Sequence, residues 1–258
     1  MKKAIEAGEC ASAHVMQYYI GEFDGNTFID TTCAGEPLLF EFGTDNYAAV
    51  TFAGCSDKII LGWGENWNYV RETPAVECHG ADENEVSRDG CPCETAPPVG
   101  VYRGKMTLAR KLALVNTRFG YRLQSKPVDL DGIALCKPKC AIEEKQDHNK
   151  REIYLPKEAF YWKIDYQQSC ELVFRNDSEE TLVIRIEPDQ IVVDRSQCGV
   201  EKAAKKKYYD ILWAPRFFQE GSSMEIIYDE GYFEIFAEDG LATFSVMTYS
   251  KEKRKRSD

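Results

Sequence analysis

Two tryptophans and several polar side chains occur close together in the segment Trp63-Gly64-Glu65-Asn66-Trp67-Asn68. The segment follows the apolar run Ile59-Ile60-Leu61, so a buried strand gives way there to indoles placed between amides. A sugar ring presents an apolar C–H face, which an aromatic ring can cover, and a rim of hydroxyls that need directional hydrogen-bond partners. Trp67 between Asn66 and Asn68 therefore predicts a carbohydrate site.

The alternative is that both tryptophans belong to the core. Trp63 continues the apolar run, which favours a core position for it. Asn66 and Asn68 would need hydrogen-bond partners if they were buried, which favours a surface role for Trp67.

The composition limits the classes of partner. The chain has 258 residues, 43% of them hydrophobic and 12% aromatic, which is enough for one large β domain or two modest ones. With a net charge of −11, nucleic acid and anionic membrane surfaces are disfavoured as partners, whereas a neutral polyhydroxylated ligand is unaffected. The basic residues of segment 251–258 are interpreted as a solvated tail.

The sequence shows neither a membrane-spanning run nor an export signal. No apolar run has the length of a membrane span, and the first ten residues contain no apolar core of a signal peptide. We therefore expect a cytoplasmic chain as written, while export of a longer parent protein stays open.

The ten cysteines are scattered along the chain, so reduced thiols are expected rather than a disulfide framework. Cys78-His79 and Cys91-Pro92-Cys93 offer four metal ligands within one loop, and a metal-stabilised loop is one alternative function. Structural zinc sites usually have two residues between paired cysteines, and the spacing here is tighter. We expect no metal and no cofactor.

The first half of the chain is patterned as closely spaced short strands, which indicates an all-β fold. Asp24-Gly25 joins two aromatic runs within 16–29 as a hairpin. Residues 102–114 alternate apolar and polar side chains like a half-buried strand, although their composition also suits a helix. Further strands are expected at 38–40, 45–52 and 58–63, and residues 72–100 read as an inserted surface loop.

The second half predicts a β-sandwich. Residues 126–158 are interpreted as a linker and variable surface segment, so we place the domains at 1–125 and 126–250, followed by the tail 251–258. Turn residues at 177–180, 230–231 and 238–240 separate alternating runs. The expected strands are 170–176, 181–186, 191–196, 224–229, 232–236 and 241–248.

Six segments in order resemble glycoside hydrolase family 32, the group of invertases, levanases and β-fructofuranosidases. Residues 18–25 resemble the family's "Y-F-x-G-D-F-D-G", and residues 45–52 resemble "D-F-Y-A-x-x-T-F". Residues 62–67 are similar to "G-W-M-N-N-W", and residues 103–112 to "R-G-A-M-S-L-P-R-E-L". Residues 193–196 and 233–240 resemble the two signatures of the family's C-terminal sandwich. The resemblance implies a partial five-bladed β-propeller followed by a β-sandwich.

The catalytic segments of this family are absent from the sequence. A retaining glycosidase needs a carboxylate nucleophile and a carboxylic acid about 5 Å apart. The family places its nucleophile in "W-M-N-D-P-N-G" and a further aspartate in "R-D-P", and neither segment occurs in these 258 residues. Glu9-Cys10 resembles the start of the acid/base segment "E-C-P-D", but Ala11-Ser12 follows in place of Pro-Asp. We therefore assign no catalytic residue, and the matching region begins partway round the propeller.

The resemblance assigns pocket positions by motif. Tyr47, in the "D-F-Y-A" position, and Trp67, the second tryptophan of "G-W-M-N-N-W", resemble residues that line the family's fructose pocket. Tyr47 could instead be a core residue at a strand end. Asp45 and Asn66 are their candidate polar neighbours in substrate binding. We expect Asp194 and Arg195 to form a structural pair rather than a site.

Two functions follow from the resemblance. In the first, the chain is part of a β-fructosidase that hydrolyses sucrose or fructans with retention, needs no cofactor, and is inactive without the nucleophile segment. In the second, the chain is a non-catalytic module that binds fructan or docks on a polypeptide carrying the missing N-terminal propeller blades. An incomplete propeller leaves an unpaired strand edge, which favours such docking.

Overall fold

The computed structural model is all-β, with a single short 3₁₀ turn, η3 (Glu238–Gly240), in the part that it describes. It describes residues 15–31, 37–70, 76–77, 101–102, 104–128, 130, 139–141, 149–156, 159–166, 169–198, 210–218 and 220–248. Over these ranges there is no helix with the length and apolar character needed to cross a membrane.

The N-terminal half contains a four-stranded antiparallel sheet with the order β10-β9-β6-β5. Its strands are β5 (Tyr47–Thr51), β6 (Ile59–Trp63), β9 (Arg110–Thr117) and β10 (Gly120–Pro127). Each strand pairs with the one before it among these four, which is the meander expected of a propeller blade, and we call it the blade sheet. The predicted number of blades is not tested by this sheet.

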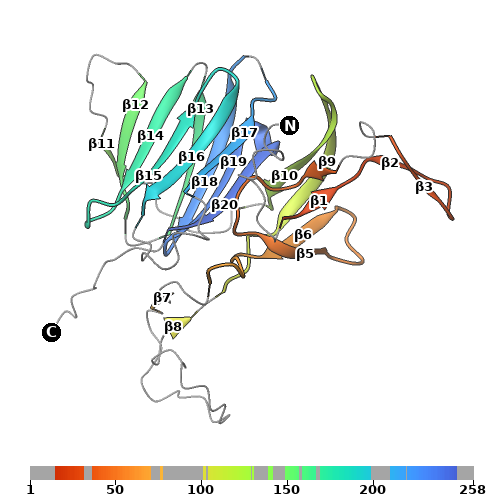
Figure 1. Ribbon diagram of the computed structural model, residues 1–258, viewed down its shortest axis with the longest axis horizontal. Coiled ribbons are helices and arrows are strands. Elements are labelled where there is room, and N and C mark those ends of the chain that lie inside the picture. Colours follow the sequence, from red (N-terminus) through yellow and green to blue (C-terminus); the bar gives the residue numbers. More distant parts are fainter. Residues whose placement is uncertain are drawn as a thin grey trace, which may run out of the picture.

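Three two-stranded ribbons accompany the blade sheet. They pair β1 (Gln17–Tyr18) with β4 (Leu38–Leu39), β2 (Gly21–Phe23) with β3 (Phe28–Asp30), and β7 (Val76–Glu77) with β8 (Val101–Tyr102). Figure 1 shows the β2–β3 hairpin projecting away from the rest of the molecule. In its turn, Asp24 Oδ1 accepts hydrogen bonds from the backbone N–H groups of Asn26 and Thr27, both at 2.8 Å. This confirms the hairpin predicted at Asp24-Gly25.

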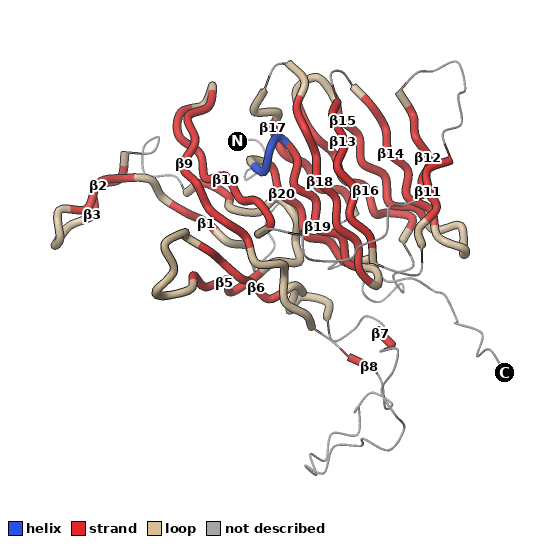
Figure 2. The backbone as a smooth tube through the Cα atoms, turned by 180° about the vertical axis from the view of Figure 1, so that it is seen from behind, coloured by secondary structure: helices blue, strands red, loops and turns tan. Residues whose placement is uncertain are grey.

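The C-terminal half is a sandwich of two sheets (Figure 2). The six-stranded sheet has the order β11-β12-β14-β15-β16-β17, and the four-stranded sheet has the order β13-β18-β19-β20. The first contains β11 (Lys139–Ala141), β12 (Lys150–Tyr154), β14 (Cys170–Arg175), β15 (Thr181–Ile186), β16 (Gln190–Gln197) and β17 (Ile211–Pro215). The second contains β13 (Phe160–Tyr166), β18 (Ser222–Asp229), β19 (Tyr232–Ala237) and β20 (Ala242–Met247). The β12–β14 pair is parallel and the other pairs are antiparallel.

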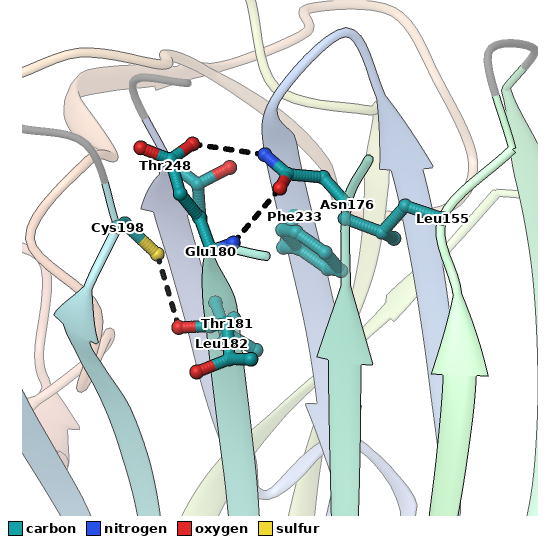
Figure 3. A pocket seen from close by; sticks show the side chains of 8 residues that line it. All are labelled: Leu155, Asn176, Glu180, Thr181, Leu182, Cys198, Phe233 and Thr248. Atoms are coloured by element: carbon teal, nitrogen blue, oxygen red, sulfur yellow. Dashed lines mark hydrogen bonds between the residues drawn. The ribbon is translucent and has the colours of Figure 1, made fainter. Parts of the chain in front are cut away.

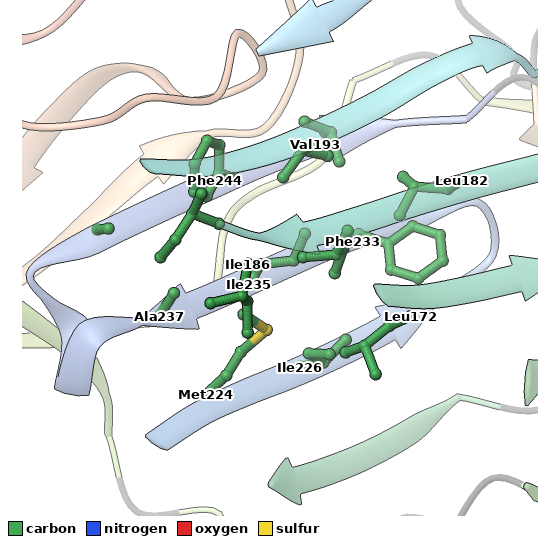
Figure 4. Packing of buried hydrophobic residues seen from close by; sticks show 14 of the residues in the cluster. Leu172, Leu182, Ile186, Val193, Met224, Ile226, Phe233, Ile235, Ala237 and Phe244 are labelled. Atoms are coloured by element: carbon green, nitrogen blue, oxygen red, sulfur yellow. The ribbon is translucent and has the colours of Figure 1, made fainter. Parts of the chain in front are cut away.

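The core lies between these two sheets and follows from the alternation of their strands. In β15, Leu182, Ile184 and Ile186 are buried and the residues between them are partly exposed, as expected when one face of a sheet is covered. Figure 4 shows this face packing against Phe233 and Ile235 of β19.

The strands β19 and β20 differ from β15 because every residue in them is buried. One set of alternating residues faces the core, and the other set includes the polar residues Glu234, Thr243 and Ser245. These polar side chains contact the segment 40–46 and the blade sheet. The β19–β20 part of the four-stranded sheet is therefore covered on both faces, and the blade sheet forms one of the covers, whereas Lys163 and Asp165 of β13 are exposed.

The predicted strands at 45–52, 58–63, 170–176, 181–186, 191–196, 224–229, 232–236 and 241–248 are confirmed within a few residues at their ends. Residues 110–117 form a strand, not a helix. The prediction of a linker over 126–158 is wrong in part, because β12 lies within it and Ile153 is fully buried. Three of the five residues of β12 are charged, so the sequence pattern did not indicate a strand with one buried residue. Glu9, the cysteine-rich segment 78–93 and the tail 251–258 lie outside the described residues.

Cys198 gives a pH-dependent contribution to stability. Its thiol donates to the Thr181 carbonyl oxygen at 3.4 Å, beside a small cavity at one end of the sandwich (Figure 3). Burial is the main cause that raises the Cys198 pKa from 9.0 to about 12. The neutral thiol is favoured in the folded state, so stability is retained below pH 9.0 and falls as the pH rises toward the folded pKa.

We expect the free energy of unfolding to fall by up to about 1.4 kcal/mol per pH unit through this group. The measurement is urea denaturation between pH 8 and pH 10.5 for the parent chain and for Cys198→Ala. The variant is expected to lose less stability over this interval. Equal slopes for the two proteins would contradict the assignment.

Candidate functional site

An aromatic cluster lies where β5 and β6 meet. The Trp63 and Trp67 ring centroids are 4.7 Å apart with the planes tilted by 34°. Tyr47 is the cross-strand partner of Trp63, and directly opposed residues in an antiparallel pair share one face of the sheet. The Trp67 indole is 49% exposed. The structure thus connects Tyr47 and Trp67, the two predicted pocket residues, through Trp63.

Local backbone geometry sets the direction of these side chains. The β5–β6 register shifts between Tyr47 and Val50, and Ala48 has a φ of +50°. A bulge of this kind redirects the neighbouring side chain, here that of Tyr47. Gly104 has a φ of +82°, and a Cβ on it would lie 2.7 Å from Trp63 Nε1. A glycine at position 104 therefore lets the backbone pack directly against the Trp63 indole.

Asp45 lies beside the cluster in sequence but is turned into the interior. Its side chain is fully buried, and Oδ2 accepts from Arg195 Nη1 at 2.8 Å and from the Met247 N–H at 2.9 Å. Its Oδ1 accepts from the Tyr69 hydroxyl. Both carboxylate oxygens are therefore bound by the protein, which favours a structural role for Asp45 over contact with a sugar.

Asn66 is also fully buried. Its Nδ2 donates to the Thr44 carbonyl oxygen at 2.8 Å, and its Oδ1 accepts from the Asn68 N–H at 2.9 Å. The amide beside Trp67 thus shapes the turn that carries the indole, and this position favours support of the cluster over direct binding.

The predicted pair of Asp194 with Arg195 is wrong. Arg195 pairs with Asp45, and both side chains are 0% exposed. Asp194 pairs instead with Arg185 at 3.3 Å. Successive residues of a strand point to opposite faces of the sheet. The side chains of Asp194 and Arg195 in β16 therefore point away from each other and have different partners.

A second buried network joins the blade sheet to the sandwich. Arg110 Nη1 donates to Glu41 Oε2 at 2.8 Å, and Arg110 Nη2 donates to Glu234 Oε2 at 2.6 Å and to Ser245 Oγ at 2.5 Å. Burial raises the pKa of Glu234, and the nearby guanidinium opposes that rise. The Arg110 pKa is raised because its two carboxylate partners outweigh the effect of burial.

The sequence analysis did not identify Glu41, Thr44, Tyr69 and Arg110, whose buried hydrogen bonds and ion pairs hold the segments around the aromatic cluster. Arg110 had a signal, since it is a charged residue at an alternating position of an otherwise amphipathic strand. A charge at such a position needs a buried partner. Glu41 and Thr44 had no comparable signal, because they lie in an irregular segment.

The cluster can bind a ligand by stacking, and the two described carboxylates nearest to it in sequence, Asp45 and Glu65, are buried and hydrogen-bonded within the protein. Asp45 is held by Arg195 and Tyr69, and Glu65 is 1% exposed and accepts from the Gly104 N–H at 3.3 Å. Trp67, by contrast, offers an exposed indole face, which suits the apolar face of a sugar. Fold and site together define a class of all-β proteins. In this class, a blade-like sheet that carries a surface aromatic cluster suited to stacking on a sugar packs against a β-sandwich.

Comparison with known proteins identifies the family. Residues 143–257 match the family described as "Glycosyl hydrolases family 32 C terminal". This part of the chain is thus a family 32 C-terminal domain, and the chain as a whole is similar to a C-terminal portion of glycoside hydrolase family 32 proteins.

The similar proteins include a levanase, an exo-inulinase and a fructofuranosidase. A levanase from Bacillus sp. (strain L7) is 23% identical over 253 residues, covering 89% of this chain and 24% of the levanase. The crystal structure of exo-inulinase from Aspergillus awamori superposes with a TM-score of 0.63 at 18% identity, covering 92% of this chain and 45% of that one. A fructofuranosidase from Schwanniomyces occidentalis complexed with fructosylnystose gives 0.63 at 17% identity, covering 93% and 48%. The chain therefore spans less than half of these solved structures and a quarter or less of the levanases from Bacillus.

Proposed function

We propose that this chain is the C-terminal portion of a β-fructosidase that hydrolyses sucrose or fructans by a retaining mechanism. It contributes the aromatic wall formed by Tyr47, Trp63 and Trp67, together with the sandwich that supports it. The observation that carries the proposal is the exposed Trp67 indole, which packs against Trp63, the cross-strand partner of Tyr47, beside a sheet joined to a family 32 C-terminal domain.

The catalytic carboxylates belong to the part of the propeller that these residues do not include. A retaining mechanism requires a nucleophile and an acid about 5 Å apart. The two carboxylates nearest the cluster in sequence, Asp45 and Glu65, are buried and hydrogen-bonded within the protein. Without the nucleophile there is no covalent route, so this chain alone has no hydrolytic activity.

The test joins this chain to the N-terminal propeller portion of a family 32 levanase and measures fructose release from sucrose, inulin and levan. The fused protein is expected to release fructose, and the chain alone is expected to release none. If the chain alone hydrolysed sucrose and Glu9→Gln abolished that activity, the proposal that the catalytic carboxylates lie in the N-terminal propeller portion would be wrong.

Trp67→Ala in the fused protein is expected to raise KM with a smaller effect on kcat, because stacking contributes to both ground-state and transition-state binding. A loss of about 1.4 kcal/mol of contact energy corresponds to an increase of about tenfold. Tyr154→Ala is the matched control, since Tyr154 is 52% exposed on the sandwich, away from the cluster. An unchanged KM for Trp67→Ala would exclude Trp67 from the pocket.

The second candidate is a fructan-binding module without catalysis, which the exposed indole of Trp67 also supports. Titration of the chain alone with levan-type and inulin-type oligosaccharides, followed by tryptophan fluorescence, separates the two functions. Saturable binding that is lost in Trp67→Ala, together with an inactive fused protein, would favour the binding module.

A further inference from the structure

The aromatic site lies on the blade sheet and on the turn that follows β6, outside the two sheets of the sandwich. We propose that Arg195 of the sandwich is a positioning residue for this site, holding Tyr47 and Trp67 in place through Thr44, Asp45 and Asn66. The inference rests on the proposed sugar-binding role of the cluster for its functional meaning, but its geometry can be tested without any sugar.

Arg195 donates from both terminal nitrogens of its guanidinium group to the segment that leads into β5. Its Nη1 donates to Asp45 Oδ2 at 2.8 Å, and its Nη2 donates to Thr44 Oγ1 at 2.7 Å. Nη2 also lies 3.2 Å from the Tyr69 hydroxyl, and Nη1 donates to the Met247 carbonyl oxygen at 3.0 Å. A planar guanidinium fixes direction as well as distance, which a lysine ammonium does not.

Asp45 is held by the sandwich through its backbone as well. Its N–H donates to the Ser245 carbonyl oxygen at 3.0 Å, and its carbonyl oxygen accepts from the Tyr232 hydroxyl at 2.7 Å. The Met247 N–H donates to its carboxylate at 2.9 Å. Asp45 is thus bound on all sides by β16, β19, β20 and Tyr69, and Tyr47 leaves this fixed point two residues later.

Trp67 is connected to the same point by a second branch. The Thr44 carbonyl oxygen accepts from Asn66 Nδ2 at 2.8 Å. The carbonyl oxygen of Asn66 accepts from the N–H groups of Tyr69 at 3.2 Å and Val70 at 2.9 Å, which closes the turn containing Trp67. Tyr69 in turn donates to Asp45. The direct partners of Arg195 lie close to both aromatic residues in sequence: Thr44 and Asp45 come three and two residues before Tyr47, and Tyr69 comes two residues after Trp67.

Such an arrangement preorganises a stacking site. An indole covers a sugar face only when its plane is correctly oriented, and a loosely supported site loses affinity even when all its residues are present. Trp67 packs against Trp63 and lies in the turn held by Asn66, so both contribute to the orientation of its indole.

The paired indoles provide a direct readout of this geometry. Indoles 4.7 Å apart and tilted by 34° couple electronically and give an exciton couplet in the far-ultraviolet circular dichroism spectrum. Trp67→Phe in the 258-residue chain defines the spectrum without the couplet. The chain has four tryptophans, so the exposure of Trp67 is reported by the difference in acrylamide quenching between each protein and its Trp67→Phe counterpart.

The matched control is Arg216, a buried arginine of the sandwich that also has a carboxylate and a tyrosine as partners. Arg216 is 4% exposed, donates to Glu238 Oε1 at 2.7 Å, and lies over the Tyr166 ring. Arg195→Met and Arg216→Met both leave a buried carboxylate without its arginine, so both are expected to lower thermal stability. Only Arg195→Met is expected to lose the couplet and to increase quenching at temperatures where both variants are folded.

Thr44→Val is a milder second variant, which keeps the side-chain volume and removes the hydroxyl that accepts from Arg195. It is expected to weaken the couplet, and it decides the question if Arg195→Met does not fold. A couplet of parental size in Arg195→Met, or in Thr44→Val when the former is unfolded, would overturn the proposal, as would an equal loss in Arg216→Met. Failure of the fused enzyme to hydrolyse fructosides would leave this spectroscopic result unchanged, so the two proposals fail separately.

Discussion

Arg110→Met is expected to lower the free energy of unfolding by about 3–5 kcal/mol at neutral pH, the usual cost of leaving a buried charge without its partner. Arg110 is 1% exposed and its guanidinium is shared between Glu41, at 2.8 Å, and Glu234, at 2.6 Å. Methionine fills a similar volume, so no large cavity forms. The fall in the free energy of unfolding therefore measures the cost of leaving Glu41 and Glu234 buried without the arginine. Urea denaturation followed by circular dichroism measures it.

The pH dependence of this variant follows from the pKa of Glu234. Burial already raises that pKa, and Arg110 is the largest influence that opposes the rise. Without the arginine, the folded protein favours the protonated carboxyl, so stability is present at acidic pH and is lost as the pH rises. Arg110→Met is therefore expected to recover part of its deficit on acidification from pH 7 to pH 5.

Lys111→Met is the control from the same strand. Lys111 pairs with Asp57 at 2.9 Å, but the two side chains are 54% and 52% exposed. Surface pairs of this kind contribute about 0–1 kcal/mol. Similar losses for the two variants, or a loss in Arg110→Met that does not diminish at acidic pH, would show that the Arg110 network does not hold the blade sheet and the sandwich together.

The local patterns of the sequence were sufficient for most strands, and charge density explains the main miss. Alternation marked Thr181–Ile186 and Met224–Asp229 because one face of each strand meets the core. In Lys150–Tyr154 the charged residues hide Ile153, whose burial depends on parallel pairing with β14. Parallel pairing joins segments distant in sequence and leaves no turn signal between them.

The site illustrates a different limit. Tyr47 and Trp67 were found by motif, and the structure brings them together through Trp63. The roles of Asp45 and Arg195 depend on a contact across 150 positions of sequence, which no local pattern encodes. The sequence beside an aromatic motif does not distinguish a polar residue that contacts a ligand from one that pairs with a buried arginine. Only the tertiary structure shows which of the two roles Asp45 has.

Phe233→Ala is expected to cost about 3–5 kcal/mol, the range for deleting a buried phenylalanine. Phe233 is 0% exposed, with the Phe174 ring centroid at 5.4 Å and the Tyr228 ring centroid at 4.8 Å. Its neighbours are fixed in two facing sheets, which limits collapse into the cavity (Figure 4). The corresponding fall in melting temperature is between about 6 and 20 °C for a chain of this size. Phe23→Ala, at a phenylalanine 67% exposed in the β2–β3 hairpin, is expected to change stability by no more than about 0.5 kcal/mol.

The same variant tests whether the two halves of the chain unfold as one unit. Phe233 faces the sandwich core, while the next residue, Glu234, faces Arg110 of the blade sheet. Loss of the core on one face of β19 must therefore also release the blade sheet on the other face. The Trp63–Trp67 couplet, which reports the blade sheet, is expected to disappear in Phe233→Ala at the same urea concentration as the β signal of the sandwich. Two separated transitions would show instead that the buried networks of Arg110 and Arg195 do not couple the sandwich to the aromatic site.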